Sequence, residues 1–258
     1  MDPIGNEIVR LEEVASTNTL ALQEPAYLER HGLVLLARHQ TGGRGRMGRQ
    51  WVSLPGRQLQ FSVVLHPAFP SADFPLVALV SGLAVAQAIG AVTGLRPRLK
   101  WPNDVLLDGR KVCGILVEGT SGAGGKPRLV VGIGLNVNGG AADFPPELHG
   151  LLTTVAEQAG APVEPEALLR ALLERLQALW ERLSRGDKPA LLDDWRREAL
   201  LGAPERVRMG TPGGEREGVP EDVTAEGFLV VRLDDGTRLT QVSGELEWMA
   251  RTPGAGPA

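Results

Sequence analysis

The stretch GLVLLARHQTGGRGRMGRQWVSLPGRQLQFSVVL, residues 32–65, decides the fold of the chain. Its two ends, residues 32–38 and 58–65, are runs of mostly apolar residues, which is typical of strands buried in a sheet. The residues between them are too rich in Gly and Arg for either a strand or a helix. We therefore predict two sheet strands joined by an irregular loop.

The loop contains the spacing G-x-G-x-x-G, formed by Gly43, Gly45 and Gly48. This spacing is typical of a dinucleotide-binding fold when a helix opens at the third glycine. Here RQWVSLPG follows, which cannot run as a helix beyond Pro55. No second strand ends in Asp or Glu about 20 residues further on, where one would bind the ribose. The loop is therefore not the dinucleotide fingerprint.

An anion clamp explains the loop better. Glycines let the backbone wrap a phosphate, and Arg44, Arg46 and Arg49 supply planar, permanently charged donors for its oxygens. Trp51 is placed to stack on a base or to close a pocket. The alternative is a solvated basic loop that binds nothing. Three arginines within six residues beside a buried strand favour the clamp.

The second motif is KWPND at residues 100–104. Lys100 stands between Leu99 and Trp101, so its ammonium is predicted to be partly buried and to need an anionic partner. Either Asp104 is that partner in a structural ion pair, or a ligand supplies a carboxylate and a phosphate. The sequence leaves both open.

Two further segments, residues 111–118 and 131–138, are strands interrupted by glycine. Glycine weakens a strand and often marks a place where a ligand approaches the backbone. Asn136 offers both a donor and an acceptor, which suits an adenine edge or a phosphate. Cys113 is expected to be a small buried thiol rather than a nucleophile.

The rest of the chain predicts an α+β fold, with a mixed sheet backed by helices and a small C-terminal SH3-like β-barrel. Helices are expected at residues 73–92, 152–159, 165–184 and 189–200, and further strands at 98–101, 105–107, 111–118 and 128–137. After residue 202 the sequence pattern changes to short strands separated by Gly and Asp turns. We predict a catalytic domain at 1–201, the β domain at 202–250 and a disordered tail at 251–258.

Composition limits the partners and the compartment. The formal net charge of −4 offers no global attraction to nucleic acid or to an anionic membrane. Cys113 is the only cysteine, so no intrachain disulfide can form, and a reducing, cytoplasmic location is expected. Residues 74–92 lack charge over 19 positions, close to the length of a membrane span, but their many small residues favour a core helix.

The motifs taken together resemble the biotin–protein ligase family. They are STN at 16–18, GRGRMGRQW at 43–51, KWPNDV at 100–105, KVCGILVE at 111–118, GIGLNVN at 132–138 and SGE at 243–245. The match covers nearly the whole chain, and GRGRxGRxW followed by KWPND is its most specific part. The resemblance implies the fold that biotin and lipoate ligases share with class II aminoacyl-tRNA synthetases.

The resemblance also implies roles for single residues. For catalysis it implies Lys100, on the reacting carboxylate and α-phosphate, together with Arg46 and Arg44. The residues implied to bind biotin are Ser16, Thr17, Asn18, Gln40, Gly43, Arg44, Gly45, Arg46, Lys100, Gly114, Ile115, Gly132 and Gly134. Those implied to bind ATP are Arg44, Arg46, Arg49, Trp51, Lys100, Leu135 and Asn136. It assigns no metal ligand, and Asp104 is the candidate general base.

The implied reaction uses ATP and Mg²⁺ to activate biotin as biotinyl-5′-AMP. The biotinyl group then passes to a lysine of the biotin carboxyl carrier protein subunit of a biotin-dependent carboxylase. Some bacterial members carry an N-terminal helix-turn-helix domain, for which the position of STN leaves no room. We therefore expect the short, enzyme-only form, with no DNA partner and no membrane partner. The sequence does not fix the oligomeric state and leaves open a homodimer, since many relatives dimerise through the sheet.

Two other functions remain open. A lipoate or octanoate ligase would keep the fold and change the acyl group, although the Arg-rich SGGG motif of lipoate ligases is absent from the sequence. A non-enzymatic nucleic-acid-binding module would use GRGRMGR and the β domain. The acidic charge balance weighs against the second.

Overall fold

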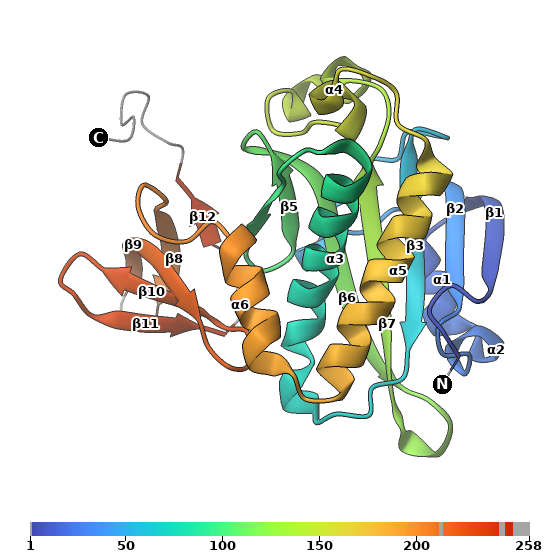
Figure 1. Cartoon of the computed structure of the whole chain (residues 1–258), viewed down its shortest axis with the longest axis horizontal. Coiled ribbons are helices and arrows are strands. Elements are labelled where there is room, and N and C mark those ends of the chain that lie inside the picture. Colours follow the sequence, from blue (N-terminus) through green and yellow to red (C-terminus); the bar gives the residue numbers. More distant parts are fainter. Residues whose placement is uncertain (1, 212–213, 243–245, 250–258) are drawn as a thin grey trace.

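A seven-stranded sheet forms the centre of the molecule, and the stretch 32–65 supplies two of its inner strands (Figure 1). The computed structural model describes residues 2–211, 214–242 and 246–249. The strand order is β1-β2-β3-β7-β6-β5-β4. Only β1 and β2 run parallel, and every other neighbouring pair is antiparallel. The predicted mixed sheet is confirmed. Its strands are β1 Ile8–Val14, β2 Val34–Gln40, β3 Gln58–Leu65, β4 Arg98–Lys100, β5 Asp104–Leu107, β6 Arg110–Ser121 and β7 Pro127–Asn136.

Helices cover the two faces of this sheet unequally. Three long helices, α3 Pro75–Thr93, α5 Pro165–Ser184 and α6 Lys188–Glu198, pack together over one face (Figure 1). The short α1 Thr17–Gln23 contacts β2, β3 and β7, with α2 Pro25–Leu28 beside it, and α4 Val155–Ala159 follows β7. Much of the other face therefore stays uncovered.

Helix α3 is the uncharged segment that is long and apolar enough to cross a membrane. Most of it is buried inside the molecule, against α5, α6 and strands β4 to β6. An apolar helix packed on all sides is a core helix. Gly82 shows why small residues suit it, because a Cβ there would lie 3.6 Å from Leu99 Cδ2.

Strand β3 and helix α5 have the predicted bounds, and the other predicted elements shift by a few residues. The N-terminal elements β1, α1 and α2 were not predicted. β1 reads IVRLEEV, and as an edge strand it alternates too weakly to be recognised. α1 has only seven residues, and its clearest signal is Ser16, whose side chain accepts a hydrogen bond from Thr19 N–H at its start.

The second sheet has five antiparallel strands in the order β11-β10-β9-β8-β12, in agreement with the predicted small β domain. It docks on the helices through the turn before β10. Trp101 Nε1 donates to the carbonyl of Gly227 at 2.9 Å, and Arg196 Nε donates to Asp222 at 2.6 Å. Its strands are β8 Val207–Thr211, β9 Gly214–Val223, β10 Leu229–Leu233, β11 Arg238–Gln241 and β12 Leu246–Trp248.

Buried residues of both sheets form one hydrophobic cluster. The boundary that we predicted at residue 201 therefore lies in a chain whose two parts share a core, and it stays a prediction. The SGE segment at 243–245 and the predicted tail at 251–258 lie outside the described residues.

Candidate active site

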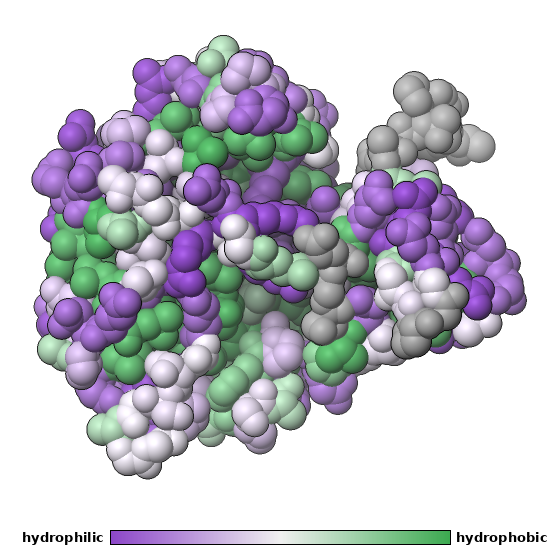
Figure 2. Space-filling view, turned by 180° about the vertical axis from the view of Figure 1, so that it is seen from behind, coloured by the Kyte–Doolittle hydropathy of each residue, from purple (hydrophilic) through white to green (hydrophobic). Residues whose placement is uncertain are grey.

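A cavity of about 200 Å³ opens on the face of the sheet that α3 and α5 leave uncovered. Figure 2 looks onto this face, which is hollowed near its centre. The cavity is bounded by the start of α1, the loop 43–51, the KWPND segment, strands β6 and β7, and β12 of the second sheet. Segments far apart in the sequence thus meet at one site.

Glycines make the floor of the cavity flat. Gly114 of β6 pairs with Gly134 of β7, and Gly132 lies two residues along on the same face. A Cβ on Gly134 would lie 2.5 Å from Trp51 Cε2, and one on Gly132 would lie 2.5 Å from Asn18 Oδ1. Neither contact is sterically possible. These positions need glycine because the side chains of Trp51 and Asn18 lie directly against the strand backbone. The sequence pattern predicted the approach of a ligand to these glycines, which stays a prediction.

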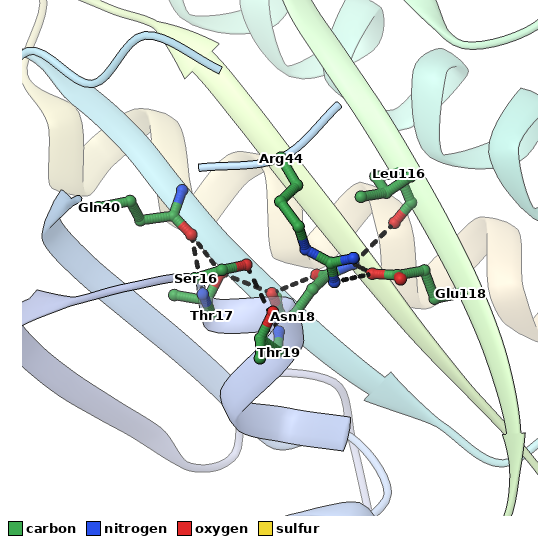
Figure 3. Close-up of polar contacts among 9 residues, drawn as sticks. Ser16, Thr17, Asn18, Thr19, Gln40, Arg44, Leu116 and Glu118 are labelled. Atoms are coloured by element: carbon green, nitrogen blue, oxygen red, sulfur yellow. Dashed lines mark hydrogen bonds and ion pairs between the residues drawn. The ribbon is translucent and has the colours of Figure 1, made fainter. Parts of the chain in front are cut away.

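One end of the cavity is polar, with Ser16, Thr17 and Asn18 at its wall and the ion pair between Arg44 and Glu118 beside Asn18 (Figure 3). We call it the uncharged end because these groups carry no net charge. Thr17 N–H donates to Gln40 Oε1 at 2.8 Å. Ser62 Oγ is hydrogen-bonded to Thr17 Oγ1 at 2.6 Å and to Asn18 Oδ1 at 2.5 Å. Buried polar groups that are all hydrogen-bonded form a rigid network. This end is therefore ordered without a ligand.

Asn18 also connects the uncharged end to the loop. Its amide donates to Glu118 Oε2 at 2.8 Å and to the carbonyl of Leu116 at 3.2 Å. Arg44 reaches down to the same Glu118 oxygen at 2.7 Å (Figure 3). One carboxylate therefore holds a recognition residue and a loop arginine together.

The loop itself crosses the mouth of the cavity. A bridge between Arg44 and Gln50 closes it, and the residues Arg46–Gly48 form a single 3-10 turn. Arg46 Nη1 donates to Asn103 Oδ1 at 3.2 Å, which ties the loop to KWPND. Met47 has a left-handed backbone with φ of 56° and is 66% exposed. The turn agrees with the prediction that no helix opens here.

The other end of the cavity gathers positive charge. Lys100 and Lys111 both line it, and Asp104 pairs with Lys111 at 2.7 Å between Oδ1 and Nζ. No carboxylate oxygen forms an ion pair with Lys100 in the described part of the chain, so the ion pair with Asp104 that the sequence left open belongs to Lys111. Burial is the main cause that lowers the pKa of Lys100, and the charges of Lys111 and Arg49 act in the same direction, whereas the carboxylates of Asp104 and Glu205 act in the opposite one.

Most residues that the sequence singled out line this cavity, and three do not. Leu135 and Asn136 are fully buried, and the Asn136 amide is used by Gln58 and by the carbonyl of Thr153. Gly43 lies beside Trp51 in an adjoining shallow pocket. A nucleotide contact through the side chains of Leu135 and Asn136 is therefore not supported by their positions.

Ile115 contributes to the cavity through its backbone. Its side chain lies on the helix side of the sheet, 3.8 Å from where a Cβ on Gly82 would be. Its carbonyl accepts from Asn103 Nδ2 at 2.8 Å, and its N–H donates to the Asn103 carbonyl at 2.9 Å. The residue fixes KWPND against β6.

Several lining residues were not predicted, notably Lys111, Asn103, Phe61, Leu246 and Trp248. Lys111 is the first residue of KVCGILVE at 111–118, so its charge was a usable signal. Trp248 carries no local signal, because it reaches the cavity only through the docking of the second sheet.

Together, the fold and the cavity define a site for one small ligand that presents a polar, uncharged end and an anionic end. Two family models match the chain: "Biotin/lipoate A/B protein ligase family" at residues 11–138 and "Biotin protein ligase C terminal domain" at residues 205–247. The chain belongs to the biotin/lipoate A/B protein ligase family.

Individual proteins agree with this assignment. A biotin--[acetyl-CoA-carboxylase] ligase from Paracoccus denitrificans is 36% identical over 89% of this chain and 95% of its own length. The protein of the same name from Mycobacterium tuberculosis is 35% identical over 82% of this chain and 77% of its own length. The structure of biotin protein ligase from Aquifex aeolicus in complex with biotin and ATP is 28% identical, covers 96% of this chain and 100% of that chain, and has a TM-score of 0.79.

Proposed function

We propose that this protein uses ATP to activate biotin as biotinyl-5′-AMP and transfers the biotinyl group to a lysine of a biotin carboxyl carrier protein. The observation on which this rests is one cavity with an uncharged hydrogen-bonding end and a cationic end, joined by a glycine floor. The family of the chain and the names of its relatives support the same reaction.

The uncharged end suits the head of biotin. The ureido ring of biotin has one carbonyl acceptor and two N–H donors on a compact bicycle. Ser16, Thr17 and Gln40 place hydroxyl and amide groups around this part of the cavity. Groups already held by hydrogen bonds lose little freedom when a ligand binds. Trp51 lies directly on the glycine floor and lines the cavity, so its indole offers an apolar surface to the chain of biotin.

The cationic end suits the meeting of a carboxylate with ATP. A biotin carboxylate oxygen must attack the α-phosphorus, and pyrophosphate must leave. Both reactants are anions, so cations must offset their repulsion and hold them in line. Lys100, Arg46 and Arg49 line this end. Lys100 forms no ion pair with a described carboxylate, so its charge is available to the reacting groups.

In the transfer step the amine of the carrier lysine attacks the acyl carbon of the adenylate, and AMP leaves. Asp104 is the candidate base for that amine, although it pairs with Lys111. Mg²⁺ is expected to enter with the triphosphate, because Mg²⁺ is commonly held by substrate phosphates and water. Among the described residues, no group of three or more His, Cys, Asp or Glu side chains is arranged to hold a metal by itself.

ATP–pyrophosphate exchange with biotin, lipoate and octanoate as competing acids tests the proposed reaction. We expect exchange that depends on biotin and on Mg²⁺. Exchange that depends on lipoate or octanoate would instead give the protein the other activity of its family. Salt-sensitive retention of DNA or RNA, without any exchange, would favour the nucleic-acid-binding alternative.

We further propose a cytoplasmic homodimer. Cys113 is buried, and burial raises the pKa of its thiol well above the ordinary range, which fits an inert cysteine in a reducing compartment. β1 is an edge of the central sheet, and an edge strand can pair with a second chain. Light scattering at several protein concentrations would measure the oligomeric state.

A further inference from the structure

The second sheet places an aromatic ring beside the one lysine of the cavity that has no carboxylate partner among the described residues. Trp248 of β12 lines the cavity, and Lys100 Nζ lies 5.6 Å from the centroid of its ring. We propose that Trp248 is a positioning residue for Lys100, holding its ammonium in the cavity without neutralising it. The proposal rests on the proposed function, because Lys100 is positioned for the activation of biotin.

Ion pairs do not explain why Lys100 stays in place. Its ammonium is partly buried, the charges of Asp104 and Glu205 attract it, and those of Lys111 and Arg49 repel it. No described carboxylate forms an ion pair with it. The nearby carboxylate of Asp104 is paired with Lys111. A cation over the face of an indole is attracted to it, and more strongly as water is excluded. Trp248 supplies that attraction.

An aromatic ring can hold Lys100 without cancelling its charge, whereas a paired carboxylate cannot. A carboxylate beside Lys100 would cancel its charge and would repel the anionic groups that must meet here. The indole attracts the cation through its quadrupole and carries no net charge. Lys100 is thus held, and its full charge remains available to a carboxylate or a phosphate.

The docking of the second sheet fixes the position of Trp248. The hydrogen bond from Trp101 Nε1 to the Gly227 carbonyl joins the residue after Lys100 directly to that sheet. Gly227 packs so closely on α3 that a Cβ there would lie 2.9 Å from Leu76 Cδ2. These two contacts hold the second sheet beside KWPND. Arg196 adds hydrogen bonds to Asp222 and to the carbonyl of Val223 in β9, which stabilise the docked sheet away from Lys100.

A second observation at Trp248 agrees with a role in the cavity. Its Nε1 is buried and has no hydrogen-bond acceptor in the described structure. A buried N–H without a partner is costly, so a structural role alone explains this side chain poorly. The ring face is used by Lys100, and the N–H remains available to an acceptor on a ligand.

The test compares Trp248→Leu with Trp248→Phe, which keeps an aromatic face. Each is made in the wild-type chain and in Lys100→Ala, and biotin-dependent pyrophosphate exchange is measured. We expect Trp248→Leu to lower kcat about tenfold, and Trp248→Phe to stay within about threefold of wild type. In Lys100→Ala, the same Leu substitution should change the remaining rate less than about twofold. Equal losses in both backgrounds would overturn the proposal.

Arg196→Gln is the matched control, because it loosens the docking of the same sheet without touching Lys100. It should lower the Tm while leaving kcat below the melting range within about twofold of wild type. If Trp248→Leu and Arg196→Gln lower the Tm and kcat in the same proportion, Trp248 only holds the sheet in place.

A further readout does not depend on the identity of the acid. The rate at which an acylating reagent modifies the Lys100 amine can be followed by peptide mass spectrometry, with Lys126 as an internal reference. Trp248→Leu should change the Lys100 rate several-fold and leave the Lys126 rate unchanged, and Trp248→Phe should restore the Lys100 rate. Absence of biotin-dependent exchange in the wild type would count against the proposed function alone. An unchanged labelling rate of Lys100 would count against the role of Trp248.

Discussion

The two ends of the cavity differ in how complete they are without a ligand. At the uncharged end, Thr17, Asn18 and Ser62 are hydrogen-bonded to one another or to the sheet. At the cationic end, Lys100 lies near the cations of Lys111 and Arg49 and near the carboxylates of Asp104 and Glu205. It forms no ion pair with a described carboxylate. The first end is therefore preorganised for recognition. The second carries excess positive charge that an anionic transition state can use, which is where a catalyst gains most.

The largest effect should come from the cationic end. Lys100→Ala is expected to lower adenylate formation by about 10²–10³-fold, the usual cost of removing one preorganised electrostatic group. The fold should persist because the ammonium has no structural ion pair to lose. Lys100→Arg should not restore the rate, since a planar fork differs from a compact charge. Single-turnover assays with circular dichroism would measure both. A near-wild-type rate in Lys100→Ala would show that the charge at the cationic end is not needed for catalysis.

A substitution in the glycine floor should affect binding more than chemistry. Gly134→Ala places a Cβ 2.5 Å from Trp51 Cε2, so the indole, which lines the cavity, must shift. Overpacking of this kind costs about 1–3 kcal/mol, which predicts a KM for biotin raised about tenfold with a smaller change in kcat. Gly119→Ala in β6 is the control, because its Cβ would meet Leu129 Cδ2 at an ordinary 3.5 Å. Equal kinetics for the two variants would show that the floor is not a binding surface.

The loop that joins the two ends should respond to ligand. Its contacts from Arg44 to Glu118 and from Arg46 to Asn103 are partly exposed and worth about 0–1 kcal/mol each. Trypsin should therefore cut after Arg44, Arg46 or Arg49 in the empty protein. Biotin with Mg-ATP should slow this cleavage about tenfold by ordering the loop. If cleavage is equally fast with and without ligand, the loop is no clamp.

Loss of one loop arginine should weaken retention of the intermediate. Arg46→Gly removes the hydrogen bond to Asn103 and one cation from the mouth of the cavity. The adenylate should then escape several-fold faster to water or to unintended lysines, because the loop closes poorly. Biotin incorporated into bovine serum albumin would report the escape. Wild-type retention in this variant would limit the role of Arg46 to loop structure.

The smallest effect should lie far from both ends. Burial, and the charge of His66, lower the pKa of His31 to about 4. His31 Nδ1 accepts a hydrogen bond from His66 N–H at 3.0 Å, which protonation would abolish. Because the unfolded chain binds this proton more readily, stability is present above pH 6.5 and is lost as pH falls toward 4. The Tm should fall by a few degrees over this window, roughly 2–4 °C per kcal/mol, and less so in His31→Gln. An equal fall in that variant would assign the pH effect to other groups.

The elements that were predicted correctly are those determined by residues close together in the sequence. Strand β3 and helix α5 follow from apolar runs with periods of two and 3.6, and their predicted bounds match the structure. The glycines of the floor could be picked out in the sequence, because a glycine inside a strand weakens the strand and often marks a close approach to its backbone. The pairing of Asp104 with Lys111 was not predictable, because it depends on the register of β5 and β6.

Contacts between segments far apart in the sequence could not be predicted. Trp248 lies near Lys100 only because the second sheet docks beside KWPND, and no spacing in the sequence reports that docking. Leu135 and Asn136 stand inside a motif of the family, yet the hydrogen bonds that bury Asn136 depend on the register of β3 against β7. Motif membership indicated the right strand but not which side chains face the cavity.

We propose that one cavity binds biotin by its uncharged end and activates it at the cationic end. The most direct test is a single turnover with the protein in excess over biotin, in the presence of Mg-ATP and without a carrier, quenched and analysed by mass spectrometry. We expect biotinyl-5′-AMP at close to one equivalent per biotin, retained by the wild-type protein and strongly reduced in Lys100→Ala. Absence of biotinyl-5′-AMP from the wild-type reaction, or formation of a lipoyl or octanoyl adenylate in its place, would contradict the claim.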